Sequence, residues 1–417
     1  MRQRGTGTLF DSIHYYGLGR SGFKLTSSAA ANYDKPLTAV EIYGAYPNDT
    51  VDTAMLYRSA MEVYARGANV IIPHGMWYDT AKVTCPPEIS HRSARLGAEL
   101  PDYNRFVGRC SLLLQGGRHV ADIGILYPIA ALHAAYSFEI PAAAGFGHEA
   151  GPKEADYLKI SDRLTCDIRR DFTFLHPEVM DKRCKVKGAT LCLNNDTNWE
   201  EYRAILIPGG KVISWSNLEK IEKFYENGGC VIGTSQLAEK SAEFGRDGDV
   251  QRAIARLFGQ PPAKGSAPYR LKTSGKGGKT YFAEQPSIEA LQAILDDALP
   301  VADVVFENTP RLRSGGGMLS YLHKVKDGAN IYHFANSTND RVDTWVRLRG
   351  KMTLQAWDPH TGTMTPLEYS HLGGKPEGTT RVRLTLEPVK ALFLVEASRW
   401  KLGHAEKTLE KMKGSSR

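Results

Sequence analysis

The stretch LTAVEIYGAY (residues 37–46) is a short apolar run that suits a buried β-strand, yet it carries one carboxylate, Glu41. Burying a carboxylate is costly unless the group is paired or used. A second apolar strand, ANVIIPHG (residues 68–75), ends at His74. The sequence therefore predicts two strands that each place a chemically active side chain at the carboxyl end.

Helical sequence surrounds these two strands, with helices expected over residues 24–36, 52–67 and 100–117. Strands that alternate with helices indicate a parallel sheet. Glu41 and His74 are 33 residues apart, and a (β/α)8 barrel of about 250 residues advances by about 31 residues per unit. The spacing fits two adjacent barrel units. It also fits a doubly wound sheet, and spacing alone does not choose between them.

The rest of the chain changes character twice. Residues 118–300 keep the α/β rhythm, with apolar strands expected at 120–128, 202–210 and 230–235 and helices at 154–171 and 216–229. This order predicts a flavodoxin-like or amidotransferase-like α/β domain. Residues 301–400 contain short strands and turns, which predicts a C-terminal β-sandwich. The expected organisation is the last units of a barrel (1–117), the α/β domain (118–300), the sandwich (301–400) and a basic tail (401–417).

Composition narrows the class of protein. The 417 residues are 42% hydrophobic and 24% charged, which indicates a globular chain of two or three domains. The net charge is +7, but no basic stripe is interleaved with aromatic residues, so no nucleic-acid partner is expected. No run of 18 apolar residues predicts a membrane span. The N-terminus lacks the apolar segment of a signal peptide, and the compartment stays open.

Metal and thiol chemistry find little support in the sequence. The six cysteines form no CxxC pair and no metal-ligand spacing. Cys230 lies at the start of a strand rather than on the strand-to-helix elbow that presents a nucleophile. The loop NNDTNWEE (residues 194–201) could ligate calcium, but a surface loop is the better interpretation. No cofactor is expected.

The surroundings of Glu41 and His74 point to a sugar. Aromatic residues cluster near both positions, namely Tyr43, Tyr46, Trp77 and Tyr78. Sugars stack their C–H faces on aromatic rings and bond their hydroxyls to acids and imidazoles. The competing interpretations are an ion pair between Glu41 and an arginine or lysine, a structural His74 bonded to a backbone carbonyl, and ordinary loop packing for the aromatics. A glycosidase also needs a second carboxylate, and residues 1–117 offer no other acid at a strand end.

Several motifs in order resemble rhamnosidase-type glycoside hydrolases, that is, family 106 and close relatives. They are KLTSSAAANYDKPLTAVEIYGAY, YARGANVIIPHGMWY, PPEIS and GRHVADIGILYP, followed later by LQAWDPHTGTMTPL and KALFLVE. The resemblance covers most of residues 24–240 and about 320–396, and it corresponds to the C-terminal portion of those enzymes. The sequence departs from the pattern at Asp34, where the family usually has glycine.

The resemblance implies roles for particular residues. Glu41 matches the general base of an inverting mechanism that activates water against the anomeric carbon, and His74 matches a histidine that contacts substrate hydroxyls. Tyr43, Trp77 and Tyr78 are expected to line the same site. The family's general acid lies on an earlier barrel strand, and no position here matches it. The chain is therefore expected to begin inside the barrel, with about 190 residues absent, and to be inactive or nearly so alone.

The implied partners are a carbohydrate, from a plant or bacterial polysaccharide or glycoside, and either the absent N-terminal part or a second copy of the chain. The parent enzyme is expected in the periplasm or outside the cell. The alternative is a non-catalytic carbohydrate-binding or assembly module, for which Trp345 or Trp357 would bind the sugar. The weakest alternative is a hydrolase that uses Cys230.

Overall fold

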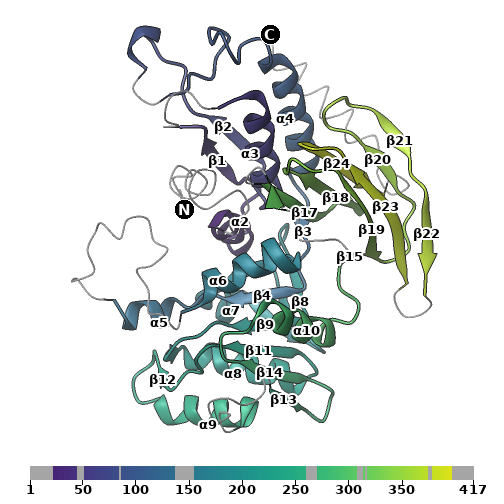
Figure 1. The fold of residues 1–417 in the computed structure, drawn as a ribbon. Helices are drawn as coiled ribbons and strands as arrows, with labels where there is room; N and C mark the ends of the chain where they lie inside the picture. Colours follow the sequence, from purple (N-terminus) through teal and green to yellow (C-terminus); the bar gives the residue numbers. More distant parts are fainter. Residues whose placement is uncertain are drawn as a thin grey trace.

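The computed structural model of the chain describes residues 22–44, 51–83, 86–136, 155–259, 270–307, 313–314, 317–373 and 378–396. Three regions follow one another along the chain (Figure 1). A first helical region lies beside two antiparallel sheets, and an α/β layer lies below both in this view. The tail 401–417 and Tyr46 lie outside the described residues.

The first region holds the two predicted strands. Its elements are α2 (Gly22–Asn32), β1 (Ala39–Ile42), α3 (Thr53–Ala65), β2 (Val70–Pro73), the 3-10 turn η2 (Thr80–Lys82), α4 (Leu100–Leu114) and β3 (Arg118–His119). β1 and β2 form a two-stranded parallel sheet in which Glu41 pairs with Ile72. Asp52 caps α3, since its side chain accepts a hydrogen bond from the backbone N–H of Met55. The described residues form no closed barrel.

The α/β layer is a six-stranded sheet with helices on both faces. Its strands are β4 (Ile123–Leu126), β5 (Phe172–Leu175), β9 (Ala204–Ile207), β11 (Cys230–Thr234), β14 (Lys279–Ala283) and β13 (Arg270–Thr273). They lie in the order β13-β14-β11-β9-β4-β5, and every pair is parallel except β13 with β14. The five parallel strands thus have the 2-1-3-4-5 order of flavodoxin-type sheets.

Helices cover both faces of this sheet and build separate cores there. They are α5 (Ile129–Ala134), α6 (Tyr157–Asp162), the π-helical turn η3 (Arg163–Ile168), α7 (Pro177–Arg183), α8 (Trp215–Glu226), α9 (Asp247–Phe258) and α10 (Ile288–Ala298). One core joins α6, η3 and α10 to the sheet, and the other joins α7, α8 and α9. Two small sheets flank the layer, namely β6 (Cys184–Lys187), β7 (Thr190–Leu193) and β8 (Glu200–Tyr202), and β10 (Val212–Ile213) with β12 (Lys240–Ser241).

The C-terminal region consists of two antiparallel sheets. One contains β15 (Val304–Glu307), β19 (Val342–Arg349), β23 (Thr379–Leu386) and β22 (Tyr369–Leu372). The other contains β16 (Arg313–Ser314), β17 (Gly317–Lys326), β18 (Ala329–Asn336), β24 (Lys390–Val395), β20 (Gln355–Trp357) and β21 (Met364–Pro366), with β3 paired to β17. Side chains from both sheets, such as Phe334 and Val346, share one core. The mixed α/β architecture expected from the sequence is confirmed.

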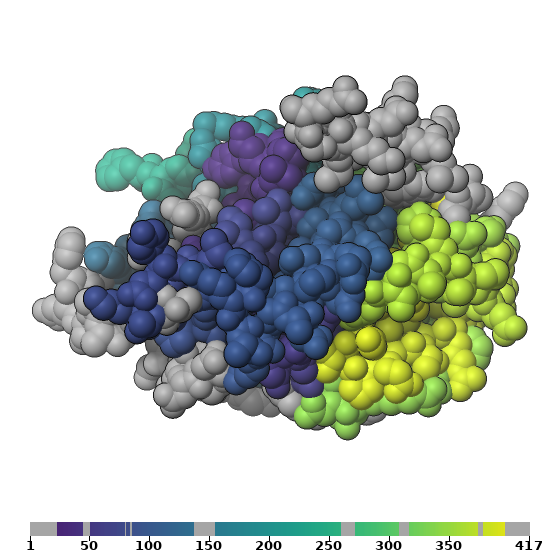
Figure 2. All heavy atoms as spheres, turned by 90° about the horizontal axis from the view of Figure 1, so that it is seen from above, coloured from purple at the N-terminus to yellow at the C-terminus, as the bar shows by residue number. Residues whose placement is uncertain are grey.

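The second of these sheets also forms a core with the first region. Tyr64 of α3 and Phe106 of α4 belong to the same buried cluster as Ile331 and Phe393 of β18 and β24. Figure 2 shows the blue residues of the first region lying directly against the yellow-green strands of the C-terminal sheets. This sheet is therefore covered on both faces, by α3 and α4 on one side and by its partner sheet on the other.

A buried ion pair fastens the same interface. Glu62 of α3, 1% exposed, pairs with Arg66 at 2.8 Å. The Glu62 carboxylate also accepts hydrogen bonds from the hydroxyls of Ser320 and Ser337, in β17 and after β18. A buried charge needs such partners, because without them its desolvation is not offset. The first region and the sheet are thus joined by specific polar contacts as well as by apolar packing.

Among the described residues, no helix combines the length and the apolar character that crossing a membrane requires.

Candidate active site

Glu41 and His74 meet at the carboxyl edge of the two-stranded sheet. Glu41 lies in β1 and His74 follows β2 directly, and the backbone N–H of His74 donates to the carbonyl of Ile42 at 2.8 Å. Because β1 and β2 are parallel, their carboxyl ends lie at the same edge. The imidazole Nδ1 of His74 is 2.7 Å from Oε1 of Glu41. Two side chains 33 positions apart in the sequence therefore form one hydrogen-bonded pair.

The Glu41 carboxylate is more exposed than the sequence suggests. Val40 and Ile42 point into the core, with 3% and 2% exposure, whereas the Glu41 side chain is 42% exposed on the opposite face of the sheet. The carboxylate thus avoids the cost of burial, because the strand alternates faces and only its apolar neighbours point into the core. Its hydrogen-bond partner is a histidine and not the arginine or lysine of the competing interpretation.

Two glycines lie against the rings of His74 and Trp77. A Cβ on Gly44 would lie 2.8 Å from Cγ of His74, so the ring packs against bare backbone. Gly75 has a φ of +76°, and a Cβ there would lie 3.2 Å from the Trp77 ring. The rings of His74 and Trp77 pack edge to face with centroids 5.7 Å apart. Both glycines are needed for the His74 and Trp77 rings to sit where they do.

Two ring nitrogens at this site have no partner. Nε2 of His74 and Nε1 of Trp77 are buried atoms without a hydrogen bond among the described residues. Buried polar atoms in native proteins are normally paired, so each exception calls for an explanation. When Nδ1 of His74 donates to Glu41, Nε2 of the neutral ring is an acceptor, and the indole N–H is a donor. A ligand with hydroxyl groups can satisfy both.

The tyrosines expected at the site behave differently. Tyr43 is 1% exposed, and its hydroxyl bonds the Leu56 carbonyl and the Tyr103 hydroxyl, both at 2.7 Å. Its φ of +76° interrupts the strand alternation and turns the ring into the core, away from the face of Glu41. Tyr43 therefore has a structural role and is left out of the proposed site. Tyr78 is fully exposed.

Sequence reasoning missed the support for Trp77. The guanidinium of Arg92 donates to the Trp77 carbonyl and pairs with Glu88 at 2.8 Å. Glu88 also accepts a hydrogen bond from Ser90, and these contacts lower the pKa of its carboxyl. The only sequence signal was the motif PPEIS, whose glutamate had no assigned partner.

The thiol hypothesis fails on geometry. Cys230 is 8% exposed at the start of β11, and burial raises the pKa of its thiol, which disfavours the nucleophilic thiolate. The elbow after β11 carries Ser235, with a φ of +52°. Its hydroxyl donates to Asp156 at 2.6 Å rather than to a histidine. Among the described residues, this elbow therefore lacks the histidine of a Ser–His nucleophile pair.

Asp34 and the loop 194–201 interact in a way that explains two features of the sequence. The Asp34 carboxylate accepts hydrogen bonds from the backbone N–H groups of Asp196, Thr197 and Asn198, at 2.8–3.4 Å. Burial raises the pKa of Asp34, but these hydrogen bonds outweigh burial and lower it. Asp34 has a φ of +57°, a conformation that glycine adopts freely. The described residues contain no group of three or more histidine, cysteine or acidic side chains that could hold a metal ion.

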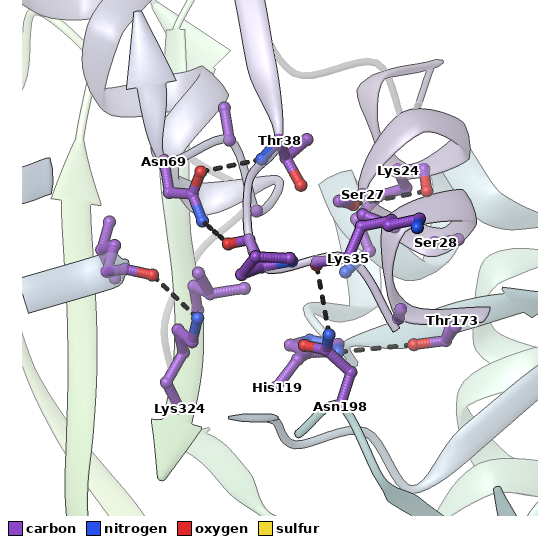
Figure 3. Close-up of a pocket in the computed structure, with 17 residues that line it drawn as sticks. Lys24, Ser27, Ser28, Lys35, Thr38, Asn69, His119, Thr173, Asn198 and Lys324 are labelled. Carbon is purple, nitrogen blue, oxygen red and sulfur yellow. Dashed lines mark hydrogen bonds between the residues drawn. The ribbon is translucent and has the colours of Figure 1, made fainter. Parts of the chain in front are cut away.

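A second polar cluster lies at the other ends of β1 and β2. Figure 3 shows it around a small cavity of about 40 Å³, beside Thr38 and Asn69, which precede the two strands. His119 lies between two carboxylates, 2.7 Å from Asp171 and 2.8 Å from Glu200. The cavity has room for only a few water molecules. This cluster joins the regions and does not face Glu41.

The family follows from a comparison of the sequence with protein-family models. The model described as alpha-L-rhamnosidase, glycoside hydrolase family 106, matches residues 153–371, more than half of the 417-residue chain. The chain belongs to glycoside hydrolase family 106. This confirms the resemblance drawn from the sequence motifs. Glu41 and His74 lie outside the matched segment, so the match says nothing of their roles in this family 106 chain.

Solved structures share the fold of this family 106 chain. The rhamnosidase from Novosphingobium sp. PP1Y matches with a TM-score of 0.65 and 18% identity over 90% of this chain and 33% of its own. The β-galactosidase from Bacillus circulans sp. alkalophilus gives 0.58 and 12% over 90% and 58%. The alpha-L-fucosidase isoenzyme 2 from Paenibacillus thiaminolyticus gives 0.57 and 13% over 91% and 63%. The chain thus spans about a third of the length of the Novosphingobium enzyme.

A search of curated proteins gives no match.

The two tryptophans of the binding-module alternative are both engaged. The Arg381 guanidinium lies 3.8 Å from the centroid of the Trp345 ring, which is 38% exposed. Trp357 packs against the core of the first region, and its indole N–H donates to Gln355 at 3.2 Å. Neither ring has the unpaired buried nitrogen that marks Trp77.

Proposed function

We propose that this chain forms part of a glycoside hydrolase that cleaves α-L-rhamnoside-like bonds with inversion, and that Glu41 is its general base. The observation that carries the proposal is the pairing of Glu41 with His74 at 2.7 Å, beside two unpartnered ring nitrogens. Family membership supports the substrate class. A partly exposed carboxylate next to an imidazole can take a proton from a water molecule and so activate it.

The proposed roles divide among three side chains. Glu41 accepts the proton of the attacking water through the carboxylate oxygen that His74 does not bind. His74 orients Glu41 through Nδ1 and receives a sugar hydroxyl at Nε2. Trp77 provides a ring face for the C–H groups of the sugar and its N–H for an oxygen. Tyr78, exposed nearby, is proposed as an outer contact with the rest of the substrate.

The general acid is proposed to come from residues other than those described. An inverting enzyme holds its two carboxyl groups about 6.5–9.5 Å apart, and no second carboxylate is bonded into the Glu41–His74 pair among the described residues. The proposed source is a segment that corresponds to the part of the Novosphingobium enzyme that this chain does not match, or a second copy of the chain. In this proposal β1 and β2 are adjacent units of a barrel whose inward face carries Glu41 and Ile72. Residues 1–117, 118–300 and 301–400 then correspond to the barrel units, the α/β domain and the sandwich.

The test compares hydrolysis of an aryl α-L-rhamnoside by the 417-residue chain alone and by the same chain joined to any in-frame coding sequence upstream. We expect activity only in the joined form, and Glu41→Gln should lower its kcat by about 10²–10⁴-fold. The matched control is Glu201→Gln, an exposed glutamate in β8, which should leave kcat unchanged. Hydrolysis that survives Glu41→Gln would overturn the proposal.

A binding measurement separates the non-catalytic alternative. L-Rhamnose titrated into the joined form should give binding that Trp77→Ala weakens. If the sugar binds but the joined form hydrolyses no rhamnoside, the carbohydrate-binding module is favoured over the hydrolase.

A further inference from the structure

A ligand-sized pocket lies in the α/β layer, separate from the Glu41 site. Its volume is about 440 Å³, whereas the small cavity beside Thr38 and Asn69 in Figure 3 has a volume of about 40 Å³. The residues that line it come from α2, from the ends of β4 and β5 and from the start of α5, and all are described: Leu25, Thr26, Ser28, Ala29, Asn32, Tyr33, Tyr127, Ile129, Phe174 and His176. Ligand pockets in proteins are typically about 300–1,000 Å³.

The position of the pocket is one where ligands bind in doubly wound sheets. Tyr127 follows β4 and His176 follows β5, so the pocket lies at the carboxyl ends of these parallel strands. The order of the sheet reverses between β4 and β9, whereas the pocket lies on the other side of β4, next to β5. The pocket thus shares with the usual ligand sites of this fold the position outside the carboxyl ends of parallel strands, but not the reversal itself. Helix α2 of the first region supplies half of the lining residues. Figure 1 shows this helix next to the α/β layer.

Aromatic rings form much of the lining. Tyr127 and Phe174 pack edge to face with centroids 6.2 Å apart. Tyr33 and His176 lie 6.3 Å apart and tilted, and Tyr33 is 42% exposed. Ring edges and faces presented together favour a flat aromatic ligand, which can make the same offset or edge-to-face contacts.

The polar groups of the lining are few and mostly occupied. The side-chain NH2 of Asn32 donates to the backbone carbonyls of Ser28 and Phe174. The side-chain oxygen of Asn32 accepts a hydrogen bond from the backbone N–H of His176. The Ser28 hydroxyl accepts from the Phe174 N–H. Among the described residues, the Tyr33 hydroxyl and Nε2 of His176 have no hydrogen bond. Among the described residues, no lysine, arginine or carboxylate lines the pocket.

This inventory selects one class of ligand. A sugar carries a hydroxyl on almost every carbon, and most of them would lose their water partners here without gaining others. A charged molecule would find no counter-charge. We infer that the pocket binds a small neutral aromatic molecule with one or two hydroxyl groups, a phenol, whose ring lies among Tyr33, Tyr127, Phe174 and His176.

The test uses phenol as the probe and the full 417-residue chain. Phenol binding is measured by saturation-transfer NMR and by the shift of the His176 ring protons. Tyr33→Ala should weaken binding roughly two- to tenfold, by the loss of one aromatic contact. Ala29→Phe, which places a ring inside the pocket, should weaken it by roughly tenfold or more. The matched control is Phe244→Ala, a fully exposed aromatic of the same layer that does not line the pocket.

The outcomes are distinct. Phenol that shifts His176 and responds to Tyr33→Ala but not to Phe244→Ala supports the site. Absence of a His176 shift, equal binding by wild type and Tyr33→Ala, or stronger binding of L-rhamnose than of phenol overturns it. If Ala29→Phe does not fold, Tyr33→Ala still decides, because the Tyr33 side chain is partly exposed. Glu41→Gln should not alter phenol binding, so this test is independent of the proposed hydrolase.

Discussion

The two histidine clusters at opposite ends of β1 and β2 differ in how completely their polar atoms are paired. Both ring nitrogens of His119 have carboxylate partners, and Asp171 also pairs with Lys24 at 2.7 Å. His74 has one carboxylate partner, and its Nε2 has none among the described residues. A fully satisfied buried network holds a fold together. The cluster of His74 combines polar atoms that have no partner among the described residues with a Glu41 side chain that is 42% exposed, and it is therefore the better candidate for chemistry.

The largest expected change in the free energy of unfolding comes from removing Asp171 from the His119 cluster. Asp171→Ala should lower the free energy of unfolding by about 3–5 kcal/mol, because Lys24 would keep a buried charge without its partner and His119 would lose one of its two carboxylates. Glu41→Gln should change it by less than about 0.5 kcal/mol, since its side chain is partly exposed. Urea unfolding of the two variants measures both values. Equal destabilisation would contradict the distinction between the clusters.

The next largest expected effect is a pH dependence of the free energy of unfolding that arises from His119. Burial and Lys24 lower the pKa of His119, but the charge of Asp171 and the hydrogen bonds to Asp171 and Glu200 outweigh them and raise it. Its stabilising contribution is therefore fully present below the unfolded pKa of about 6.5 and is lost as pH rises through the folded value. The free energy of unfolding should fall with pH in that window by at most about 1.4 kcal/mol per unit.

The control for this pH dependence is a pair of variants. His119→Gln should remove this part of the slope, whereas His91→Gln, at an exposed position, should retain it. A slope that is the same in both variants would assign the dependence to another group.

The last prediction concerns the packing of the His74 ring against Gly44. Gly44→Ala should displace the His74 ring, because the new Cβ would lie 2.8 Å from its Cγ. We expect the free energy of unfolding to fall by at most about 1 kcal/mol. In the chain joined to the upstream coding sequence, kcat should fall roughly 10- to 100-fold, because the Glu41–His74 pair would be misplaced. Gly108→Ala is the matched control, since nothing lies within 4 Å of a Cβ there. If both variants lower kcat equally, His74 does not position Glu41.

The sequence predicted the parts of the fold that local patterns determine. Alternating helices and strands located β1 and β2, and parallel pairing then placed Glu41 beside His74. The inward turn of Tyr43 could not be foreseen, because a positive φ at a tyrosine leaves no sequence signal. Nor could the contact of Gly44 with the His74 ring, since it joins residues from two different strands. The unpaired nitrogens of His74 and Trp77 depend on that same packing.

The sequence patterns also do not predict which regions of the chain contact one another. Asp34 differs from the family's usual glycine, and the structure gives it a partner in the loop 196–198 of the α/β layer. The hydrogen bonds of Glu62 to Ser320 and Ser337, and the core shared by α3, α4 and β18, likewise link segments more than 200 residues apart. Hydrophobic periodicity identifies which face of a helix is buried, but it does not identify what buries it.

That shared core has a consequence for synthesis of the protein. Helices α3 and α4 leave the ribosome long before β24 (Lys390–Val395), the last strand of the sheet that covers them. Their apolar side chains therefore stay exposed in a partly folded nascent chain until nearly the whole sequence has been translated. Chaperones bind such exposed apolar surfaces, which cause aggregation when they are left uncovered. Production of this protein is thus expected to depend on chaperone supply more strongly than its final stability would indicate.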